Sequence, residues 1–317
     1  MHIPDGFLDV KTAVAMAGVA AVAVAVSAAV VRRRLAPRQV PLMGLTATFV
    51  FAAQMLNFPV AGGTSGHLLG ACLTAVLVGP AAAVLVMTAV LVVQCLVFAD
   101  GGLLALGANV VNMAVVGGLV GGALFGAAGP FARSLRGRVT AAAFAAWCTV
   151  VLASAACALE LAWSATVPLR VVFPAMVGIH MVIGVGEAVI TALVLVAIAA
   201  IRPELVMGGA VAAGRWRRLD LVLAGVLLAL CLAVFVAPFA SVLPDGLERV
   251  AATLGFAERA SESAAPLADY EVPAISSPVA ATALAGAIGT FVMLGVSLLL
   301  GRLLVPRAGK QSSESAG

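Results

Sequence analysis

Long aliphatic runs, rich in alanine and valine, recur along the whole chain. Each run approaches the roughly 20 residues that a helix needs to cross a bilayer. Charged residues make up only 10% of the sequence, well under the roughly 25% of ordinary soluble domains. Inside hydrocarbon every backbone polar group needs a partner within the protein, so such runs fold as helices. The sequence therefore predicts an all-α polytopic membrane protein.

Prolines and glycines between the apolar runs divide the chain into candidate spans, because these residues end helices. The nine expected spans cover residues 10–31, 41–57, 64–79, 81–98, 103–126, 140–164, 173–200, 219–241 and 278–304. The third and fourth spans are short and joined tightly at Gly79-Pro80, so a re-entrant hairpin stays open as an alternative to two full crossings. We expect a seven-helix bundle plus two further transmembrane helices.

Two membrane modules are expected, one after the other. A seven-span module covers residues 1–201, and a basic cytoplasmic linker follows over 202–218. A two-span accessory module covers 219–305 and contains an acidic extracytoplasmic loop over 242–277. The acidity of this loop fits either a cation entrance or an ordinary solvated loop. A polar cytoplasmic tail over 306–317 is predicted to be disordered.

The basic residues predict the orientation of the chain, because they gather on the cytoplasmic side of membrane proteins. With the amino terminus outside, 14 of the 18 basic residues fall inside. They are Arg32, Arg33, Arg34, Arg38, Arg133, Arg136, Arg138, Arg202, Arg215, Arg217, Arg218, Arg302, Arg307 and Lys310. We expect a cell-membrane protein with an extracytoplasmic amino terminus and a cytoplasmic carboxyl terminus. The basic residues are not interleaved with aromatics in a soluble segment, so no nucleic-acid partner is expected.

The first two residues offer a chelating group. We expect Met1 to be retained, because methionine removal favours a small second residue and His2 is bulky, and we expect the first apolar run to be a permanent span. The amine nitrogen, the amide nitrogen of His2 and its Nδ1 can then close adjacent five- and six-membered chelate rings. His67, in a glycine-rich segment over 62–70, is the plausible source of a fourth nitrogen. A plane of four nitrogens suits Ni(II) or Cu(II).

Polar residues beside these two segments could brace such a site. Asp5 could accept hydrogen bonds that orient the site, or it could cap the first span. Asn57, Thr64 and Ser65 flank the segment before His67 and could hold it, although plain loop chemistry explains them equally well. We expect His67 in the opening turn of the third span, where a lone imidazole needs a partner.

Four polar residues lie inside later spans. Asn109 and Asn112 stand three residues apart on one helical face, where they could bond to other helices or line a transient path for the metal. His180 and Glu187 lie two turns apart on one face. They could form a second metal site or a proton relay, or a buried polar pair with each member bonded elsewhere. Overlapping G-x-x-x-G pairs within 117–122 predict a close helix contact, inside this chain or with another subunit.

These segments together resemble the CbiM/NikM family, the substrate-binding subunits of energy-coupling-factor cobalt and nickel importers. The resemblance covers about residues 1–200 and is carried by Met1-His2-Ile3-Pro4-Asp5-Gly6-Phe7-Leu8, by Asn57-Phe58-Pro59-Val60 running into Gly66-His67-Leu68-Leu69-Gly70, and by Gly107-Ala108-Asn109-Val110-Val111-Asn112-Met113. The second module holds Pro244-Asp245-Gly246-Leu247-Glu248 between its two spans. It is similar to the small accessory subunit of the CbiN/NikN type, here fused in one chain.

The resemblance implies that the amine of Met1, the amide and ring of His2 and the ring of His67 hold the metal. It implies a transport subunit with Ni(II) or Co(II) as its cargo, no permanent cofactor and no enzymatic activity of its own. The implied partners are a transmembrane coupling subunit and a pair of cytoplasmic ATPases. The sequence contains no G-x-x-x-x-G-K-[ST] phosphate loop, so ATP hydrolysis is expected in those partners.

Two other functions stay open at this point. One is an organic-solute or vitamin permease component that binds no metal. The other is a membrane-embedded metalloenzyme that uses His67, His180 and Glu187, although the sequence lacks an H-E-x-x-H motif or comparable catalytic spacing.

Overall fold

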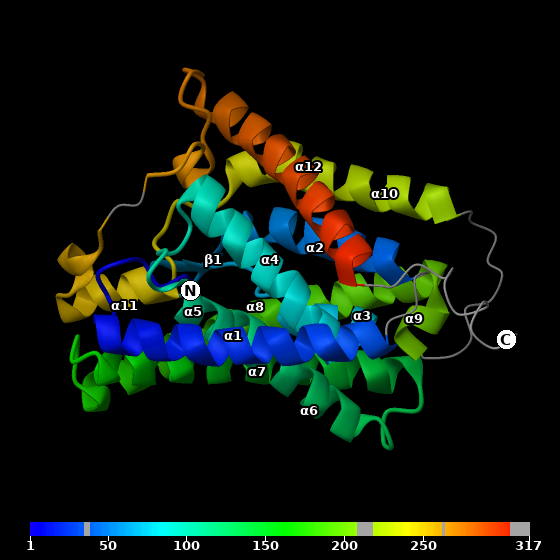
Figure 1. Cartoon of the computed structure of the whole chain (residues 1–317), viewed down its shortest axis with the longest axis horizontal. Coiled ribbons are helices and arrows are strands. Elements are labelled where there is room, and N and C mark those ends of the chain that lie inside the picture. Colours follow the sequence, from blue (N-terminus) through cyan, green and yellow to red (C-terminus); the bar gives the residue numbers. More distant parts are fainter. Residues whose placement is uncertain (35–38, 208–217, 262–263, 305–317) are drawn as a thin grey trace, which may run out of the picture.

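The computed structural model describes residues 1–34, 39–207, 218–261 and 264–304, and helices dominate it (Figure 1). Within these ranges, seven helices are long and apolar enough to cross a membrane. They cover Val10–Arg34, Pro80–Phe98, Leu106–Ala128, Leu135–Trp163, Leu169–Ile201, Val222–Phe239 and Pro278–Leu304. The prediction of an all-α polytopic membrane protein is confirmed. The predicted linker lies mostly, and the predicted tail wholly, outside the described residues.

The chain begins with an irregular segment over residues 1–9 and then enters helix α1, Val10–Arg34. Asp9 starts this helix, because its carboxylate accepts the backbone N–H of Thr12 at 2.9 Å and so satisfies a free donor of the first turn. Helix α2, Val40–Gln54, returns through the bundle with Pro41 in its first turn, a position where the missing N–H of proline costs nothing.

The third predicted span is wrong over its first half. Residues 64–79 do not form one helix, because a strand occupies Thr64–Gly66 and helix α3 covers only Ala71–Val78. The eight residues of α3 rise about 12 Å, far less than the roughly 30 Å of the hydrocarbon core. At Gly79, with φ at +89°, the chain turns directly into helix α4, Pro80–Phe98.

A short hairpin replaces the missing half of that span. Strand β1, Phe58–Val60, pairs antiparallel with strand β2, Thr64–Gly66, so that Phe58 stands opposite Gly66. The turn between the strands contains Gly62 and Gly63, whose φ angles of +86° and +70° are accessible to glycine at little cost. His67 follows β2 directly, in the irregular segment before α3, and not in the first turn of a helix.

The next transmembrane segment changes its helical pitch along its length. It consists of α5 (Leu106–Asn109), the π-helix η2 (Val110–Val120) and α6 (Gly121–Ala128). A Cβ at Gly117 would lie 2.5 Å from the side chain of Ala71, and a Cβ at Gly122 would lie 2.5 Å from the ring of Pro80. The close helix contact predicted from these glycines therefore lies inside this chain.

Two long helices complete the first module, α7 (Leu135–Trp163) and α8 (Leu169–Ile201), and they pack against each other as an antiparallel pair. The short helix α9, Pro203–Met207, follows. The accessory module consists of α10 (Arg218–Cys231), the π-helix η3 (Leu232–Val236), the 3₁₀ helices η4 (Ala237–Phe239), η5 (Ala257–Arg259) and η6 (Ala268–Tyr270), and the α-helices α11 (Gly246–Leu254) and α12 (Pro278–Leu304).

The accessory module packs against the first module and shares its core. One cluster of buried side chains joins Phe51 of α2, Val90 of α4, Ala233 of η3 and Met293 of α12. Figure 1 shows α10 and α12 beside α2, while the loop between them carries α11 to the end of the bundle that holds the amino terminus. Helix α1 runs from that end to the end that holds α9. Met1 and the accessory loop therefore meet at one end of the molecule.

Candidate metal site

The amino-terminal segment inserts between the helices. Met1 and Ile3 are buried. The Asn109 side chain binds both backbone groups of Ile3: the Ile3 N–H donates to Oδ1 of Asn109 at 2.8 Å, and Nδ2 of Asn109 donates to Ile3 O at 3.0 Å. The N–H of Gly102 also donates to Ile3 O at 2.9 Å. Asn109 therefore fixes where the first residues of the chain lie.

Asp5 binds the loop before α5 and does not cap the first span. Its carboxylate accepts the backbone N–H groups of Leu103 at 3.0 Å and Leu104 at 2.8 Å. The capping role belongs to Asp9. On its other side the carbonyl of Asp5 accepts the N–H of Ser261 at 2.9 Å, so this residue links the amino-terminal segment to both modules.

The amine of Met1 lies 3.1 Å from Nε2 of His67, although 66 positions separate the two residues. Nδ1 of His67 lies 3.0 Å from the carbonyl of Leu68. A carbonyl only accepts hydrogen bonds, so Nδ1 carries the proton and Nε2 presents a lone pair to the amine. Burial and the positive amine lower the pKa of His67 to about 3. The ring is therefore neutral at physiological pH, as a metal ligand must be.

Asp245 of the accessory loop forms an ion pair with the same amine, at 2.5 Å. Burial alone would lower the pKa of the Met1 amine, but Asp245 outweighs burial and raises it. Burial would raise the pKa of Asp245, yet the amine holds it well below its usual range. The other carboxylate oxygen accepts the N–H groups of Leu247 and Glu248 as the N-cap of α11, which fixes the carboxylate in place.

His2 lies beside His67, with the two rings stacked at a centroid distance of 5.3 Å. Its Nδ1 faces Oδ1 of Asp100 at 3.0 Å, and its Nε2 faces Oε1 of Gln94 at 3.3 Å. The predicted chelate needs Nδ1 of His2 on the same ion as the amine. The ring must therefore rotate away from Asp100 before that ligand set can form.

Asp100 is also bound by the accessory loop. The hydroxyl of Tyr270 donates to Oδ2 of Asp100 at 2.6 Å, and the Tyr270 ring stacks on Phe98 with centroids 4.6 Å apart. Burial would raise the pKa of Asp100, but the charge of His2 holds it well below its usual range. The accessory module therefore acts on both sides of the site. It supplies Asp245, which pairs with the Met1 amine, and its Tyr270 binds Asp100, which faces His2.

Buried polar side chains from three helices hold the segment after His67. Glu187 of α8, with no exposed surface, accepts the backbone N–H groups of Leu69 at 2.5 Å and Gly70 at 2.9 Å. Gln54 of α2 donates to Leu69 O at 2.8 Å, and Gln94 of α4 donates to Gln54 at 2.8 Å. Because Gln94 also faces His2, one network supports both histidines.

Thr64 and Ser65 bind the accessory loop. The N–H of Ser65 donates to Pro244 O at 2.8 Å, its hydroxyl donates to Leu243 O at 2.7 Å, and the hydroxyl of Thr64 donates to Pro244 O at 2.9 Å. The carbonyl of Asn57 accepts the N–H of Ser241 at 2.8 Å. The hairpin before His67 therefore binds the accessory loop through several hydrogen bonds.

The remaining polar residues from the sequence analysis lie in separate places. Asn112 donates to the buried carboxylate of Glu160 at 2.7 Å, whereas Asn109 donates to the amino-terminal segment at Ile3. His180 faces the Met176 carbonyl at 2.7 Å, and Glu187 binds the segment after His67, so His180 and Glu187 contact different partners. Across the described ranges, no three His, Cys, Asp or Glu side chains converge as a metal cluster.

Sequence reasoning missed the contributions of Asp245, Asp100 and Gln94. The signal for Asp245 was present as an N-cap pattern, an Asp followed three residues later by Glu248, but nothing in the sequence aims that turn at Met1. A small cavity of about 20 Å³ lies beside Met1, His67, His180 and Asp245, enough for one water or one ion.

The comparisons with known proteins agree on both modules. The family described as the cobalt uptake substrate-specific transmembrane region matches residues 2–205, and the PDGLE domain matches residues 219–306. A NikMN chain of Archaeoglobus fulgidus is 38% identical over 307 residues, which cover 95% of this chain and 98% of the relative. The fused nickel transport protein NikMN of Rhodobacter capsulatus is 36% identical over 208 residues, 61% of this chain and 60% of the relative.

A solved structure supports the same assignment. The crystal structure of a truncated transition metal transporter is 34% identical, covers 63% of this chain and 99% of that chain, and superposes with a TM-score of 0.58. Its length corresponds to the first module alone. This multi-pass membrane chain therefore belongs to the CbiM family of cobalt-uptake substrate-specific transmembrane proteins, and a PDGLE domain of the CbiN type is fused behind it.

Proposed function

We propose that this chain is the substrate-capture subunit of an importer for a divalent transition metal, Ni(II) or Co(II). The observation that carries the proposal is the contact between the Met1 amine and Nε2 of His67, 3.1 Å apart. Two nitrogen donors from distant segments meet there, with His2 stacked beside them. The named function of the fused relatives, nickel transport, fits this set of donors.

The ligands follow from the chemistry of the contacting groups. His67 offers a neutral Nε2, while the amine of Met1 gives up its proton when it takes a metal ion. The ring and amide of His2 complete a plane of four nitrogens once the ring leaves Asp100, and such a plane suits Ni(II). Asp245 then stands close to the ion, where its negative charge offsets part of the positive charge brought into the protein.

The transport cycle needs partners. In this proposal the amino terminus faces the outside, since the basic residues favour that orientation. A transmembrane coupling subunit and cytoplasmic ATPases of the energy-coupling-factor type supply the energy, because the chain lacks a phosphate-loop motif. Reorientation driven by these partners releases the ion to the cytoplasm.

Calorimetric titration of the purified full-length chain with Ni(II) and with Co(II) tests the proposal. We expect saturable binding of one ion per chain for at least one of the two metals, and a large loss of affinity in His67→Ala. A chain that binds neither metal contradicts the proposal, and an organic-solute permease would then become the better account. Binding that survives His67→Ala but disappears in His180→Ala would favour the metalloenzyme alternative.

A further inference from the structure

One ring nitrogen of His180, Nε2, forms no hydrogen bond with the described residues. The residue lies in α8 and only 2% of its surface is exposed. Its Nδ1 lies 2.7 Å from the Met176 carbonyl, and this is its one hydrogen bond among the described residues. The carbonyl accepts, so Nδ1 carries the proton and Nε2 keeps a lone pair. Nε2 forms no hydrogen bond with the described residues, so its lone pair is available to a ligand.

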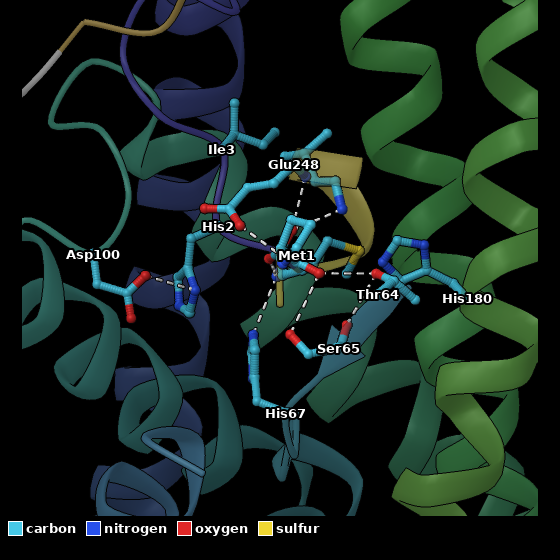
Figure 2. Close-up of polar contacts among 12 residues, drawn as sticks. Met1, His2, Ile3, Thr64, Ser65, His67, Asp100, His180 and Glu248 are labelled. Carbon is cyan, nitrogen blue, oxygen red and sulfur yellow. Dashed lines mark hydrogen bonds and ion pairs between the residues drawn. The ribbon is translucent and has the colours of Figure 1, made fainter. Parts of the chain in front are cut away.

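His180 also borders a small cavity beside Met1. His180 lines the cavity of about 20 Å³ together with Met1, His67 and Asp245, and this volume accepts a single water-sized ligand. Figure 2 shows His180 on one side of Met1 and the His2–Asp100 pair on the other. His180 therefore lies on the side of Met1 opposite His2.

The accessory loop closes this cavity through Gly246. A Cβ at position 246 would lie 2.7 Å from Cε1 and 2.8 Å from Nε2 of His180, closer than real side chains allow. Only glycine lets the backbone pass over the imidazole at this distance. Asp245, the neighbour of this glycine, reaches the amine at the same time. One turn of the accessory module thus places a carboxylate at the cavity and covers His180.

We propose that His180 Nε2 and Asp245 form a transit position, in which a divalent ion is held before it passes to the amine, His2 and His67. The inference rests on the proposed function and adds a step to it. Imidazole and carboxylate are suitable ligands for Ni(II) and Co(II), and they replace two waters of the incoming ion without a change in oxidation state. Two side chains do not make a resident site, which agrees with the absence of a three-residue cluster in the described part of the chain.

A transit ligand has a kinetic signature. It lowers the barrier for loading and for release equally, because the end states are the same with and without it. His180→Ala should therefore reduce both rate constants by about tenfold, the lower end of the effects seen for variants around metal sites. The equilibrium affinity should stay within about twofold, since His180 is absent from the final ligand set.

The test follows Ni(II) loading of the purified full-length chain by stopped-flow absorbance, and release into excess chelator, with affinity measured separately by titration. Thr191→Val is the matched control: Thr191 is a buried polar residue of the same helix that does not line the cavity, and both rate constants should be unchanged. Gly246→Ala places a methyl group against the His180 ring from the accessory loop, and it should slow loading and release as His180→Ala does. If His180→Ala does not fold, His180→Gln supplies the same comparison.

Unchanged rate constants in the His180 variant overturn the proposal. A fall in affinity through faster release also overturns it, because His180 would then be a resident ligand. Absence of Ni(II) and Co(II) binding by the unaltered chain is a different failure, since it removes the proposed function and the transit step together.

Discussion

The amino-terminal segment is held on two faces, and the two faces are held by different kinds of contact. The first module holds the segment at Ile3 with neutral hydrogen bonds: Asn109 pairs with both backbone groups of Ile3, and Gly102 adds a third bond. The accessory module holds it with an ion pair, between Asp245 and the Met1 amine, and with one backbone bond from Ser261 to Asp5.

The two kinds of contact should differ in how they respond to a bound metal ion. A neutral hydrogen bond is worth about 0.5–1.5 kcal/mol, and an arriving cation has little effect on it. The ion pair is different, because a divalent ion replaces the proton on the amine and competes for the same carboxylate. We therefore expect the first module to fix where the ligands lie, and the accessory module to respond to the charge of the ion.

The largest expected effect comes from a ligand itself. His67→Ala removes the nitrogen that faces the amine, and we expect Ni(II) affinity to fall by more than about a hundredfold, beyond the usual range for residues that only support a ligand. Titration calorimetry measures the loss. His180→Ala is the control, and equal losses of affinity in the two variants would contradict the assignment of His67.

Asn109→Ala tests the face held by the first module. It removes two buried hydrogen bonds to Ile3, and we expect affinity to fall by about 10- to 100-fold, together with a lower melting temperature. Asn112→Ala is matched, since it removes a buried amide three residues away that binds Glu160. The control should lower the melting temperature but keep the affinity, and a similar loss of affinity in both would reduce Asn109 to a general packing role.

Asp245→Asn tests the face held by the accessory module. Binding replaces a singly charged ammonium by a doubly charged ion, so the carboxylate stabilises the loaded site more than the empty one. The amide loses this gain while it keeps the helix cap, and we expect affinity to fall by about tenfold. Glu248→Gln is the control within the same capping turn. Tighter binding by Asp245→Asn would show that Asp245 mainly competes with the ion.

Tyr270→Phe should have the smallest effect. It removes the hydroxyl that donates to Asp100 and keeps the ring stacked on Phe98. Asp100 then binds His2 more strongly and opposes its rotation, so we expect affinity to fall by about threefold, the value of one hydrogen bond. Affinity unchanged within error would exclude Tyr270 from control of His2.

The sequence predicted the membrane helices because hydrophobic runs and helix-ending residues are local signals. It predicted less well where the structure depends on distant contacts. Residues 64–66 pair with the nearby strand β1, but they also bind the accessory loop, whose Pro244 lies 180 positions away and is not visible in a local window. Asp245 reaches Met1 from 244 residues away, and only the packing of α11 against the bundle brings them together.

The sequence predicted the candidate ligands where they are neighbours in the chain, and it did not predict the contacts that bring distant residues to them. Met1 and His2 are neighbours, so their chelating chemistry follows from the sequence alone. The contact of the Met1 amine with His67 depends on the insertion of residues 1–9 between helices. Hydrogen bonds from Asn109 to Ile3 and from Leu104 to Asp5 direct this insertion, across 106 and 99 positions of the chain. The rotation of His2 toward Asp100 depends on the tertiary packing of the loop after α4.

The participation of the free amine is the central claim, and one paired titration tests it most directly. The purified chain that begins at Met1 is compared with the same chain carrying one additional alanine before Met1, after mass spectrometry has verified both termini. We predict one Ni(II) bound per unextended chain, with the yellow low-spin absorbance of a four-nitrogen plane. The extended chain should show neither the band nor comparable affinity, at an unchanged melting temperature. Equal affinity and the same band in both chains would contradict the claim.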